Sequence, residues 1–251
     1  MLAAESPINI ALVKYWGKSH EELIIPANSS LSLTLQAQAG EKPLHTLTLI
    51  RLSQDFETNQ IQLPHSSLKE VSDPRIGRML EKARAHAKDL ACWELALEGG
   101  APKRVVVAKE QLLAMKWSVH TKNTFPTAAG LASSASGLSC LAFLLGRIYS
   151  VPEAELSSLA RLGSGSACRS ILGGFVRWER GFSGPLPEDA KEEELHISSR
   201  AVQVQPASFW PELRVFVVQL ESGKKLVSSS EGMRLTAQTS ELYRFRQQFV
   251  V

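Results

Sequence analysis

Residues 126–137, PTAAGLASSASG, constrain the fold more than any other segment of the sequence. Glycine, alanine and serine dominate this run, and the apolar stretch SCLAFLLGRIY continues from it to Tyr149. We predict a glycine-rich loop leading into a buried helix over Ala132–Tyr149. Small side chains let a ligand approach the backbone, and the amide groups of the first helical turn carry a partial positive charge. The pattern favours a phosphate site, but it also occurs where helices simply cross closely.

A second segment, GSGSACR at Gly163–Arg169, has the same character. Two serine hydroxyls, flexible backbone amides and a guanidinium fork can bind a carboxylate or phosphate bidentately. The alternative is a glycine-rich turn with a solvated arginine. Two such segments in one chain favour a polyphosphate or two anionic ligands.

A third candidate is NIALVKYWGK, where Lys14 and Lys18 lie four residues apart around Tyr15 and Trp16, with a turn at Gly17. Two lysines can neutralise an anion, and the aromatic rings can exclude water from it. In the alternative interpretation, Lys18 is solvated and both aromatic rings belong to the core.

Hydrophobic periodicity predicts a chain of mixed α and β structure. Strands are expected at 7–18, 31–35, 44–52, 59–63, 105–107, 117–121, 173–179, 201–205 and 213–220. Helices are expected at 73–97, 132–149, 153–163 and after Ser228, with a surface excursion at 181–200. The first helix has Asp73 as its N-cap and Pro74 at its first position. Arg75 follows, as either a surface charge or a ligand contact.

Composition limits the possible partners. The chain has 251 residues, enough for one or two domains, and a net charge of +3. This charge is too small to create a field for nucleic acid or membranes, so we expect neither partner. Cys92, Cys140 and Cys168 lack the spacing of a disulfide framework or zinc site, and the histidines show no ligand spacing, so no structural metal is expected. Without a signal-like start or a long apolar run, a cytoplasmic protein is expected.

Five segments together resemble the mevalonate diphosphate decarboxylase family of the GHMP kinase superfamily. They are PINIALVKYWGK, IPANSSLSLTL, NTFPTAAGLASSASG, GSGSACRSILGGFVRWE and SSSEGM, the last at Ser228–Met233. Agreement in several separated segments is far more specific than the phosphate loop of the superfamily alone.

The resemblance implies an α+β or α/β fold of the ribosomal protein S5 domain 2-like type. Residues 1–183 would form the GHMP-kinase-like N-terminal lobe for ATP and substrate, and 184–251 the start of an incomplete C-terminal lobe. It also implies ATP with Mg²⁺ and the substrate 5-diphosphomevalonate. The family phosphorylates the 3-hydroxyl and expels phosphate and CO₂, giving isopentenyl diphosphate for isoprenoid and sterol synthesis. A homodimer is implied where the complete lobe is present.

The resemblance also assigns roles to individual residues. Lys14, Ser134 and Arg169 would be catalytic: Lys14 near the reacting hydroxyl, Ser134 at the γ-phosphate or metal, and Arg169 on the substrate carboxylate. ATP would be bound by Gly130, Ser133 and Ser134. The substrate contacts would be Tyr15, Trp16, Gly17, Lys18, Arg75, Ser164, Gly165, Ser166, Ala167, Cys168, Arg169 and Ser230.

One departure from the family bears on activity. The family's catalytic aspartate lies in a D-A-G-P-N-A type segment of the second lobe, and none of Asp55, Asp73, Asp89 and Asp189 has that context. We therefore expect a truncated form whose activity is in question, either a shortened normal enzyme or a natural short form. The alternatives are a non-catalytic partner of a full-length copy and a related small-molecule GHMP kinase.

Overall fold

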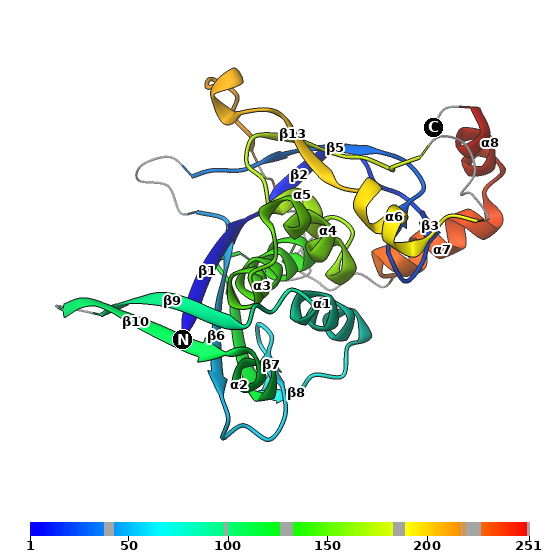
Figure 1. Cartoon of the computed structure of the whole chain (residues 1–251). Coiled ribbons are helices and arrows are strands. Elements are labelled where there is room, and N and C mark those ends of the chain that lie inside the picture. Colours follow the sequence, from blue (N-terminus) through cyan, green and yellow to red (C-terminus); the bar gives the residue numbers. More distant parts are fainter. Residues whose placement is uncertain are drawn as a thin grey trace.

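The computed structural model describes residues 1–37, 43–97, 100–125, 133–182, 189–216, 218 and 227–249. Helices and strands are interleaved, with a layer of helices packed against a large sheet (Figure 1). The expected mixed α and β class is confirmed.

The larger sheet has five strands in the order β1-β6-β11-β7-β8. Its pairs are antiparallel except β11 with β7, which are parallel. The strands are β1 (Leu2–Pro7), β6 (His45–Ser53), β11 (Lys116–Asn123), β7 (Gln60–Gln62) and β8 (Lys69–Glu70). In β6, Thr46, Thr48 and Ile50 are buried and alternate with more exposed residues, so one face of the sheet points into the core.

A four-stranded antiparallel sheet, in the order β13-β12-β5-β2, carries much of the candidate site. Its strands are β13 (Ala201–Gln205), β12 (Phe175–Trp178), β5 (Ser30–Thr34) and β2 (Asn9–Val13). The short pair β3 (Lys18–His20) and β4 (Ile25–Pro26) follows the turn at Gly17. The candidate segment NIALVKYWGK therefore begins in this sheet and ends in the turn beside it.

Helices α1 (Pro74–Arg84), α3 (Ser133–Tyr149) and α4 (Glu153–Gly163) pack together against the larger sheet. Their buried side chains form one core with the inner face of that sheet. The one-turn helix α5 (Ala167–Ser170) contacts both α3 and strand β12. It therefore carries the candidate segment Gly163–Arg169 into the space between the helices and the smaller sheet.

Two buried hydroxyl pairs join α3 to the larger sheet. The Oγ atoms of Ser6 and Ser139 are 2.6 Å apart, and Thr46 Oγ1 is 2.7 Å from Ser136 Oγ. Ser136 and Ser139 are three residues apart, so both lie on the same face of the helix. The serine-rich start of α3 therefore packs by hydrogen bonds where an ordinary core helix would use apolar side chains.

The single helix predicted over 73–97 is wrong. It ends at Arg84, and residues Leu90–Leu97 form strand β9, which pairs antiparallel with β10 (Gly100–Ala108). The helical half has the expected N-cap, because Asp73 accepts a hydrogen bond from the Arg75 amide. Alanine and lysine at 82–91 favour a helix locally, but pairing with the valine-rich strand β10 stabilises the extended form instead.

The predicted surface excursion at 181–200 is also partly wrong. Helix α6 (Glu192–Ser198) forms there and buries Leu195 and His196 against α4. The predicted strand at 213–220 is not formed over 213–216, and most of its remainder lies outside the described residues. The sequence patterns also missed the short helix α2 (Lys109–Ala114). The helix expected after Ser228 forms, but as two helices, α7 (Ser229–Thr239) and α8 (Glu241–Phe249).

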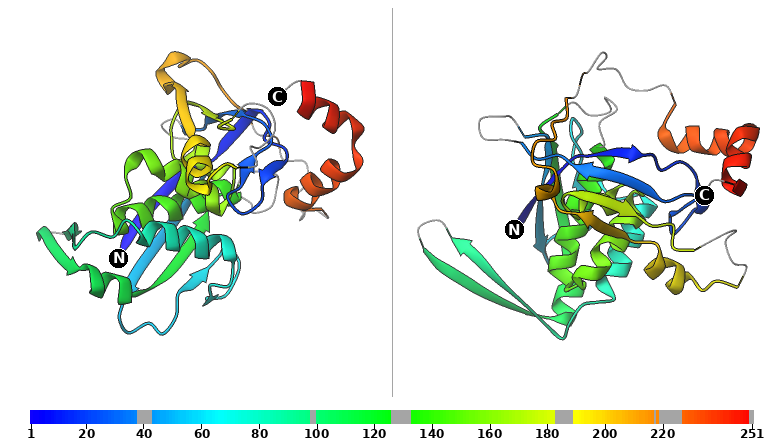
Figure 2. Two further views of the ribbon diagram at one scale, coloured as in Figure 1. Left: turned by 45° about the vertical axis from the view of Figure 1, so that its right-hand side comes forward. Right: turned by 90° about the horizontal axis from the view of Figure 1, so that it is seen from above.

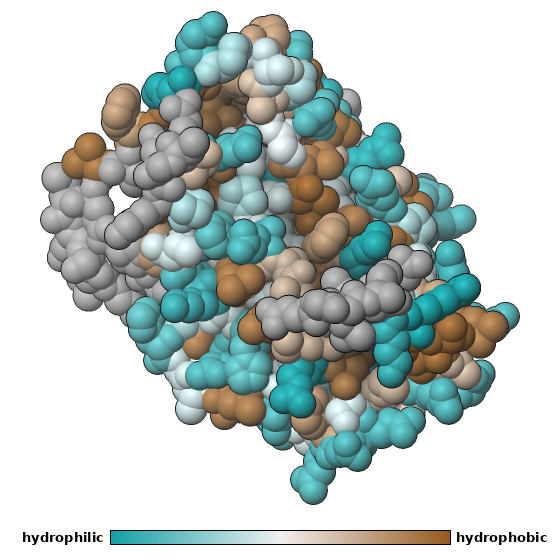
Figure 3. Space-filling view, turned by 90° about the vertical axis from the view of Figure 1, so that its left-hand side faces the viewer, coloured by the Kyte–Doolittle hydropathy of each residue, from teal (hydrophilic) through white to brown (hydrophobic). Residues whose placement is uncertain are grey.

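Two parts project from the body on opposite sides. The β9–β10 hairpin extends to one side, while α7 (Ser229–Thr239) and α8 lie on the other, beside β3 (Figures 1 and 2). On the face that includes the hairpin, hydrophobic residues are scattered among hydrophilic ones (Figure 3). No helix in the described part of the chain is long and apolar enough to cross a membrane.

Candidate active site

The indole of Trp178, at the end of β12, forms the floor of the candidate site. The ring of Tyr15 lies on it with centroids 4.7 Å apart. A Cβ at Gly165 would lie 2.7 Å from the same indole, closer than any real contact, so only glycine lets the 163–169 turn approach this ring. Trp178 thus brings together two segments that are 150 residues apart in sequence.

Arg169 is buried beside this floor and has only neutral partners among its described contacts. Its Nε donates to Ser32 Oγ at 3.0 Å and its Nη1 to Ser30 Oγ at 2.6 Å, while its guanidinium lies 5.8 Å from the Trp178 ring centre. Burial lowers the pKa of Arg169. A buried cation without a counter-charge is costly, so this position suits an anion supplied by a ligand.

Tyr15 contributes a second unsatisfied group. Its hydroxyl is buried without a hydrogen-bond partner in the described structure. Burial raises the pKa of Tyr15, and the nearby Glu21 carboxylate adds to the effect, so the hydroxyl stays protonated and can donate to an anion. Cys168, by contrast, is fully buried, and burial raises the pKa of its thiol to about 12. The thiol therefore packs rather than reacts.

The turn after Tyr15 is clamped by the C-terminal helices. Gly17 has φ +91°, and a Cβ there would lie 1.8 Å from the hydroxyl oxygen of Tyr243 on α8. That hydroxyl donates to the Trp16 carbonyl at 3.3 Å, and a Cβ at Gly232 on α7 would lie 3.6 Å from the Trp16 indole. The predicted turn at Gly17 is confirmed, and α7 and α8 cover it.

The other predicted phosphate segment opens onto a separate cavity. A cavity of about 300 Å³ lies between the start of α3 and the larger sheet, and its lining includes Ser133, Ser134, Asp73 and Arg75. Arg75 forms a bidentate ion pair with Asp73, at 3.1 Å from Nε and 2.7 Å from Nη2. The hydrogen bonds from Arg75 lower the pKa of Asp73. Arg75 thus lies with the α3 serines, not with Arg169.

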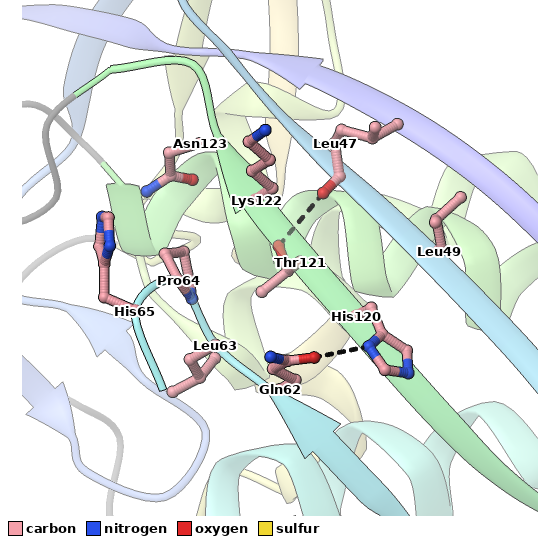
Figure 4. A pocket seen from close by; sticks show the side chains of 10 residues that line it. All are labelled: Leu47, Leu49, Gln62, Leu63, Pro64, His65, His120, Thr121, Lys122 and Asn123. Atoms are coloured by element: carbon pink, nitrogen blue, oxygen red, sulfur yellow. Dashed lines mark hydrogen bonds between the residues drawn. The ribbon is translucent and has the colours of Figure 1, made fainter. Parts of the chain in front are cut away.

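A second cavity of about 450 Å³ adjoins the first and shares with it Leu63, Pro64, Thr121 and Asn123. In Figure 4, Gln62 and His120 face each other across its floor, and His120 Nδ1 lies 2.8 Å from Gln62 Oε1. Lys122 and His65 stand at its edges (Figure 4). The two cavities flank the end of β11.

The remaining predicted site residues are placed as follows. Lys14 is exposed, and its carbonyl accepts from Asn28 Nδ2 at 3.0 Å. Lys18 forms an ion pair with Glu21. Ser230 is exposed on the first turn of α7, and Gly130 lies outside the described residues. Ser164 ends α4, Ser166 precedes α5, and Ala167 is buried within it.

Sequence analysis missed three polar residues that support Arg169. Ser30 and Ser32 accept its hydrogen bonds, and their signal is two hydroxyls with period-2 spacing on the inward face of a strand. Asn9 is buried, and its Nδ2 donates to Ser170 Oγ at 2.6 Å and to the Ser166 carbonyl at 3.4 Å. The corresponding signal is an asparagine at the start of the apolar segment NIALVKYWGK, because a polar group buried by such a segment needs a partner.

Metal binding by protein groups alone is not supported in the described part of the chain. No cluster of three or more histidine, cysteine, aspartate or glutamate residues that could hold a metal ion occurs there. The site is instead rich in cations and hydroxyls, the donors that bind anionic ligands.

Comparison with known proteins gives two family matches. Residues 6–190 match the diphosphomevalonate decarboxylase-like N-terminal domain, and residues 215–251 match the mevalonate 5-diphosphate decarboxylase C-terminal domain. The human diphosphomevalonate decarboxylase is 44% identical over 246 residues, which are 98% of this chain and 55% of that protein. The Saccharomyces cerevisiae diphosphomevalonate decarboxylase is 38% identical, over 98% of this chain and 56% of that protein. The chain thus spans little more than half the length of these relatives.

Solved structures give the same result for the fold. The mevalonate diphosphate decarboxylase from Trypanosoma brucei superposes with a TM-score of 0.77 and 35% identity, covering 99% of this chain and 57% of that one. A related structure in complex with MVAPP, AMPPCP and magnesium has a TM-score of 0.67 and 32% identity, over 98% and 63% of the two chains. The GHMP-kinase-like fold expected from the sequence is confirmed.

Proposed function

This chain belongs to the diphosphomevalonate decarboxylase family, and on that premise we propose that it acts in the ATP-dependent decarboxylation of (R)-5-diphosphomevalonate to isopentenyl diphosphate. The observation that carries the proposal is Arg169: a buried guanidinium held by two serine hydroxyls, without a carboxylate partner among the described residues and beside an unpartnered tyrosine hydroxyl. Such a site is prepared for a strongly anionic substrate, and diphosphomevalonate carries both a carboxylate and a diphosphate.

In this proposal, Arg169 binds the substrate carboxylate through charge-assisted hydrogen bonds, while the Ser30 and Ser32 hydroxyls hold its guanidinium in place. Tyr15 and Lys18 lie on either side of the Gly17 turn, where they can contact the diphosphate. Trp178 and the ring of Tyr15 exclude water, which strengthens every electrostatic contact in the site. Lys14 is assigned to the reacting hydroxyl by the family resemblance, and Ser230 to the diphosphate.

The residues at the start of α3 fit a nucleotide. Ser133 and Ser134 offer hydroxyls beside the positive end of a helix, and the adjoining cavity has apolar walls for a base and Arg75 for a phosphate. ATP would supply the phosphoryl group that converts the tertiary hydroxyl into a leaving group. Mg²⁺ would be held by the Ser134 hydroxyl together with the ATP phosphates, and it would neutralise their charge during phosphoryl transfer. One related structure contains AMPPCP and magnesium, which supports this assignment.

We assign residues 1–183 to the ATP- and substrate-binding lobe and 184–251 to the start of the second lobe; the family matches over 6–190 and 215–251 support this division. A cytoplasmic location and a homodimer of the complete protein are further parts of the proposal. Cell fractionation and analytical ultracentrifugation test them.

The test measures substrate binding and turnover separately. Calorimetry with diphosphomevalonate gives the binding constant, and release of labelled CO₂ in the presence of Mg²⁺ and ATP gives turnover. Arg169→Met is expected to weaken binding at least tenfold, a typical loss for a charged hydrogen-bonding partner. Arg177→Met is the matched control, because Arg177 lies on strand β12 and its side chain is 53% exposed.

The outcomes separate the candidate functions. Binding that depends on Arg169, together with CO₂ release, supports the decarboxylase. Binding without CO₂ release favours the non-catalytic partner, and ADP formation from a mevalonate-type substrate without CO₂ favours a small-molecule kinase. Failure of the wild-type chain to bind diphosphomevalonate would refute the proposal.

A further inference from the structure

A second arginine, Arg161, lies fully buried near the end of α4. Its Nη1 donates to the Ser199 carbonyl at 2.7 Å. Its Nη2 donates to His196 Nδ1 at 3.0 Å and to the His196 carbonyl at 3.2 Å. Its Nε has no hydrogen-bond partner in the described structure. The guanidinium therefore joins α4 to the end of α6 and to the segment that leads into β13.

All of these partners are neutral. Among the residues that the structure describes, no carboxylate forms an ion pair with Arg161. Burial lowers its pKa to about 10, so the side chain remains protonated at neutral pH. Burying a charge without a counter-charge costs desolvation free energy, which hydrogen bonds to neutral groups offset only in part. A role in stability alone is therefore a weak explanation for this arginine.

The contacts of Ser199 lead from Arg161 to the candidate site. Arg161 fixes the backbone of Ser199, and the Ser199 hydroxyl accepts from Trp178 Nε1 at 3.2 Å while donating to the Glu179 carbonyl at 3.0 Å. Ser199 is completely buried, so no water competes for these bonds. The orientation of the Trp178 indole is thus determined by a residue that Arg161 holds.

Trp178 in turn determines the geometry of the anion-binding groups. Its ring contacts Tyr15, limits the approach of Gly165 and lies below the guanidinium of Arg169. A rotation of this indole would move all three. Small displacements of binding groups are costly, because ligand contacts depend on distance and direction.

We propose that Arg161 is a positioning residue for the substrate site: through Ser199 it fixes the Trp178 indole, on which Tyr15, Gly165 and Arg169 are arranged. The inference rests on the proposed function for the nature of the ligand, a diphosphate with a carboxylate. Arg161 acts through Ser199, because its described hydrogen bonds go only to Ser199 and His196.

The experiment compares three variants of the 251-residue chain. Arg161→Met removes the donors but keeps most of the volume, Ser199→Ala removes only the hydroxyl that holds the indole, and Leu159→Ala is the matched control. Leu159 is buried on the same helix and belongs to the core on the larger sheet, so its truncation destabilises the fold without altering the Trp178 contacts. All measurements are made well below the melting temperature, with folding checked by circular dichroism.

Two quantities are measured for each variant. The first is the dissociation constant for diphosphomevalonate by calorimetry, and the second is the exchange rate of the Trp178 indole proton by ¹⁵N NMR, assigned with Trp178→Phe. Arg161→Met and Ser199→Ala are each expected to weaken binding about tenfold, as loss of supporting contacts behind a ligand residue commonly does, and to accelerate indole exchange. Leu159→Ala is expected to change neither.

The proposal is overturned if Arg161→Met binds the substrate within twofold of wild type, or if Leu159→Ala weakens binding as much as Arg161→Met does. Loss of binding with unchanged indole exchange also overturns it, because Arg161 would then act by another route. If the wild-type chain itself does not bind the substrate, the proposed function fails. Indole exchange then decides separately whether Arg161 holds Trp178.

Discussion

Acidification is expected to destabilise the protein through His196. The Nδ1 of this buried histidine accepts a hydrogen bond from Arg161, so that nitrogen is unprotonated in the folded state. Burial, together with the charges of Arg161 and Lys82, lowers the pKa of His196 from 6.5 to about 4. Glu193 and His86 also lie near the ring, and the first of these opposes the shift.

The pKa difference fixes both the sign and the size of the effect. Between pH 6.5 and 4 the unfolded chain binds a proton at this position that the folded chain does not, so the free energy of unfolding falls as the pH is lowered through that range. At about 1.4 kcal/mol per pH unit, the loss reaches about 2 kcal/mol at pH 5 and about 3 kcal/mol at pH 4. The total stability of a domain is typically about 5–15 kcal/mol, so the effect is measurable.

The assay is urea unfolding at several values between pH 7 and 5, for wild type and His196→Asn. The asparagine Oδ1 can accept the Arg161 hydrogen bond near the position of Nδ1, but the amide does not titrate. Between pH 7 and 5, the free energy of unfolding of the variant is therefore expected to fall by about 2 kcal/mol less than that of wild type. Glu193 and Asp73 have pKa values lowered from 4.5 and 3.8, so their contributions fall below this range. Equal losses of stability in both proteins would refute the reasoning.

Three further predictions concern the candidate site. Arg169→Lys is expected to bind diphosphomevalonate about tenfold less tightly in calorimetry, because an ammonium group cannot hold Ser30 and Ser32 with the same fork geometry; affinity equal to wild type would argue against the assigned role. Gly17→Ala is expected to lower the free energy of unfolding in urea by about 1–3 kcal/mol, because residue 17 has a positive φ. Adding Tyr243→Ala is expected to recover only the part of this loss that comes from the clash with the Tyr243 side chain. Gly165→Ala is expected to displace the Trp178 indole and change its fluorescence; an unchanged spectrum with unchanged affinity would contradict the close packing.

Elements with one dominant local signal were predicted well from the sequence. The helix after the glycine-rich segment and the strand at 201–205 follow from apolar periodicity and β-branched residues alone. The helix expected at 73–97 failed at its second half, because the strand at 90–97 is stabilised by pairing with 100–108 and not by its own residues. Pairing of this kind depends on a partner strand, which a local pattern does not reveal.

The candidate site was predictable in its segments but not in its arrangement. Each glycine- and serine-rich segment led us to expect an anion site, which stays a prediction, and the structure joins Tyr15, Gly165 and Arg169 around Trp178. No sequence signal pointed to Trp178 as the shared contact, or to Arg161 behind it, because both act through tertiary contacts. Arg75 lines the cavity at the start of α3, and its assignment as a substrate contact stays a prediction.

The two hydroxyl pairs between α3 and the larger sheet have a consequence for motion. A helix packed by apolar side chains can slide along a sheet at little cost, but a slide of one residue, about 1.5 Å, would break both the Ser6–Ser139 and the Thr46–Ser136 bonds in a dry interior. The helix is therefore a fixed reference frame during ligand capture. A conformational change on binding that keeps both bonds would leave α3 in place and move other elements around it.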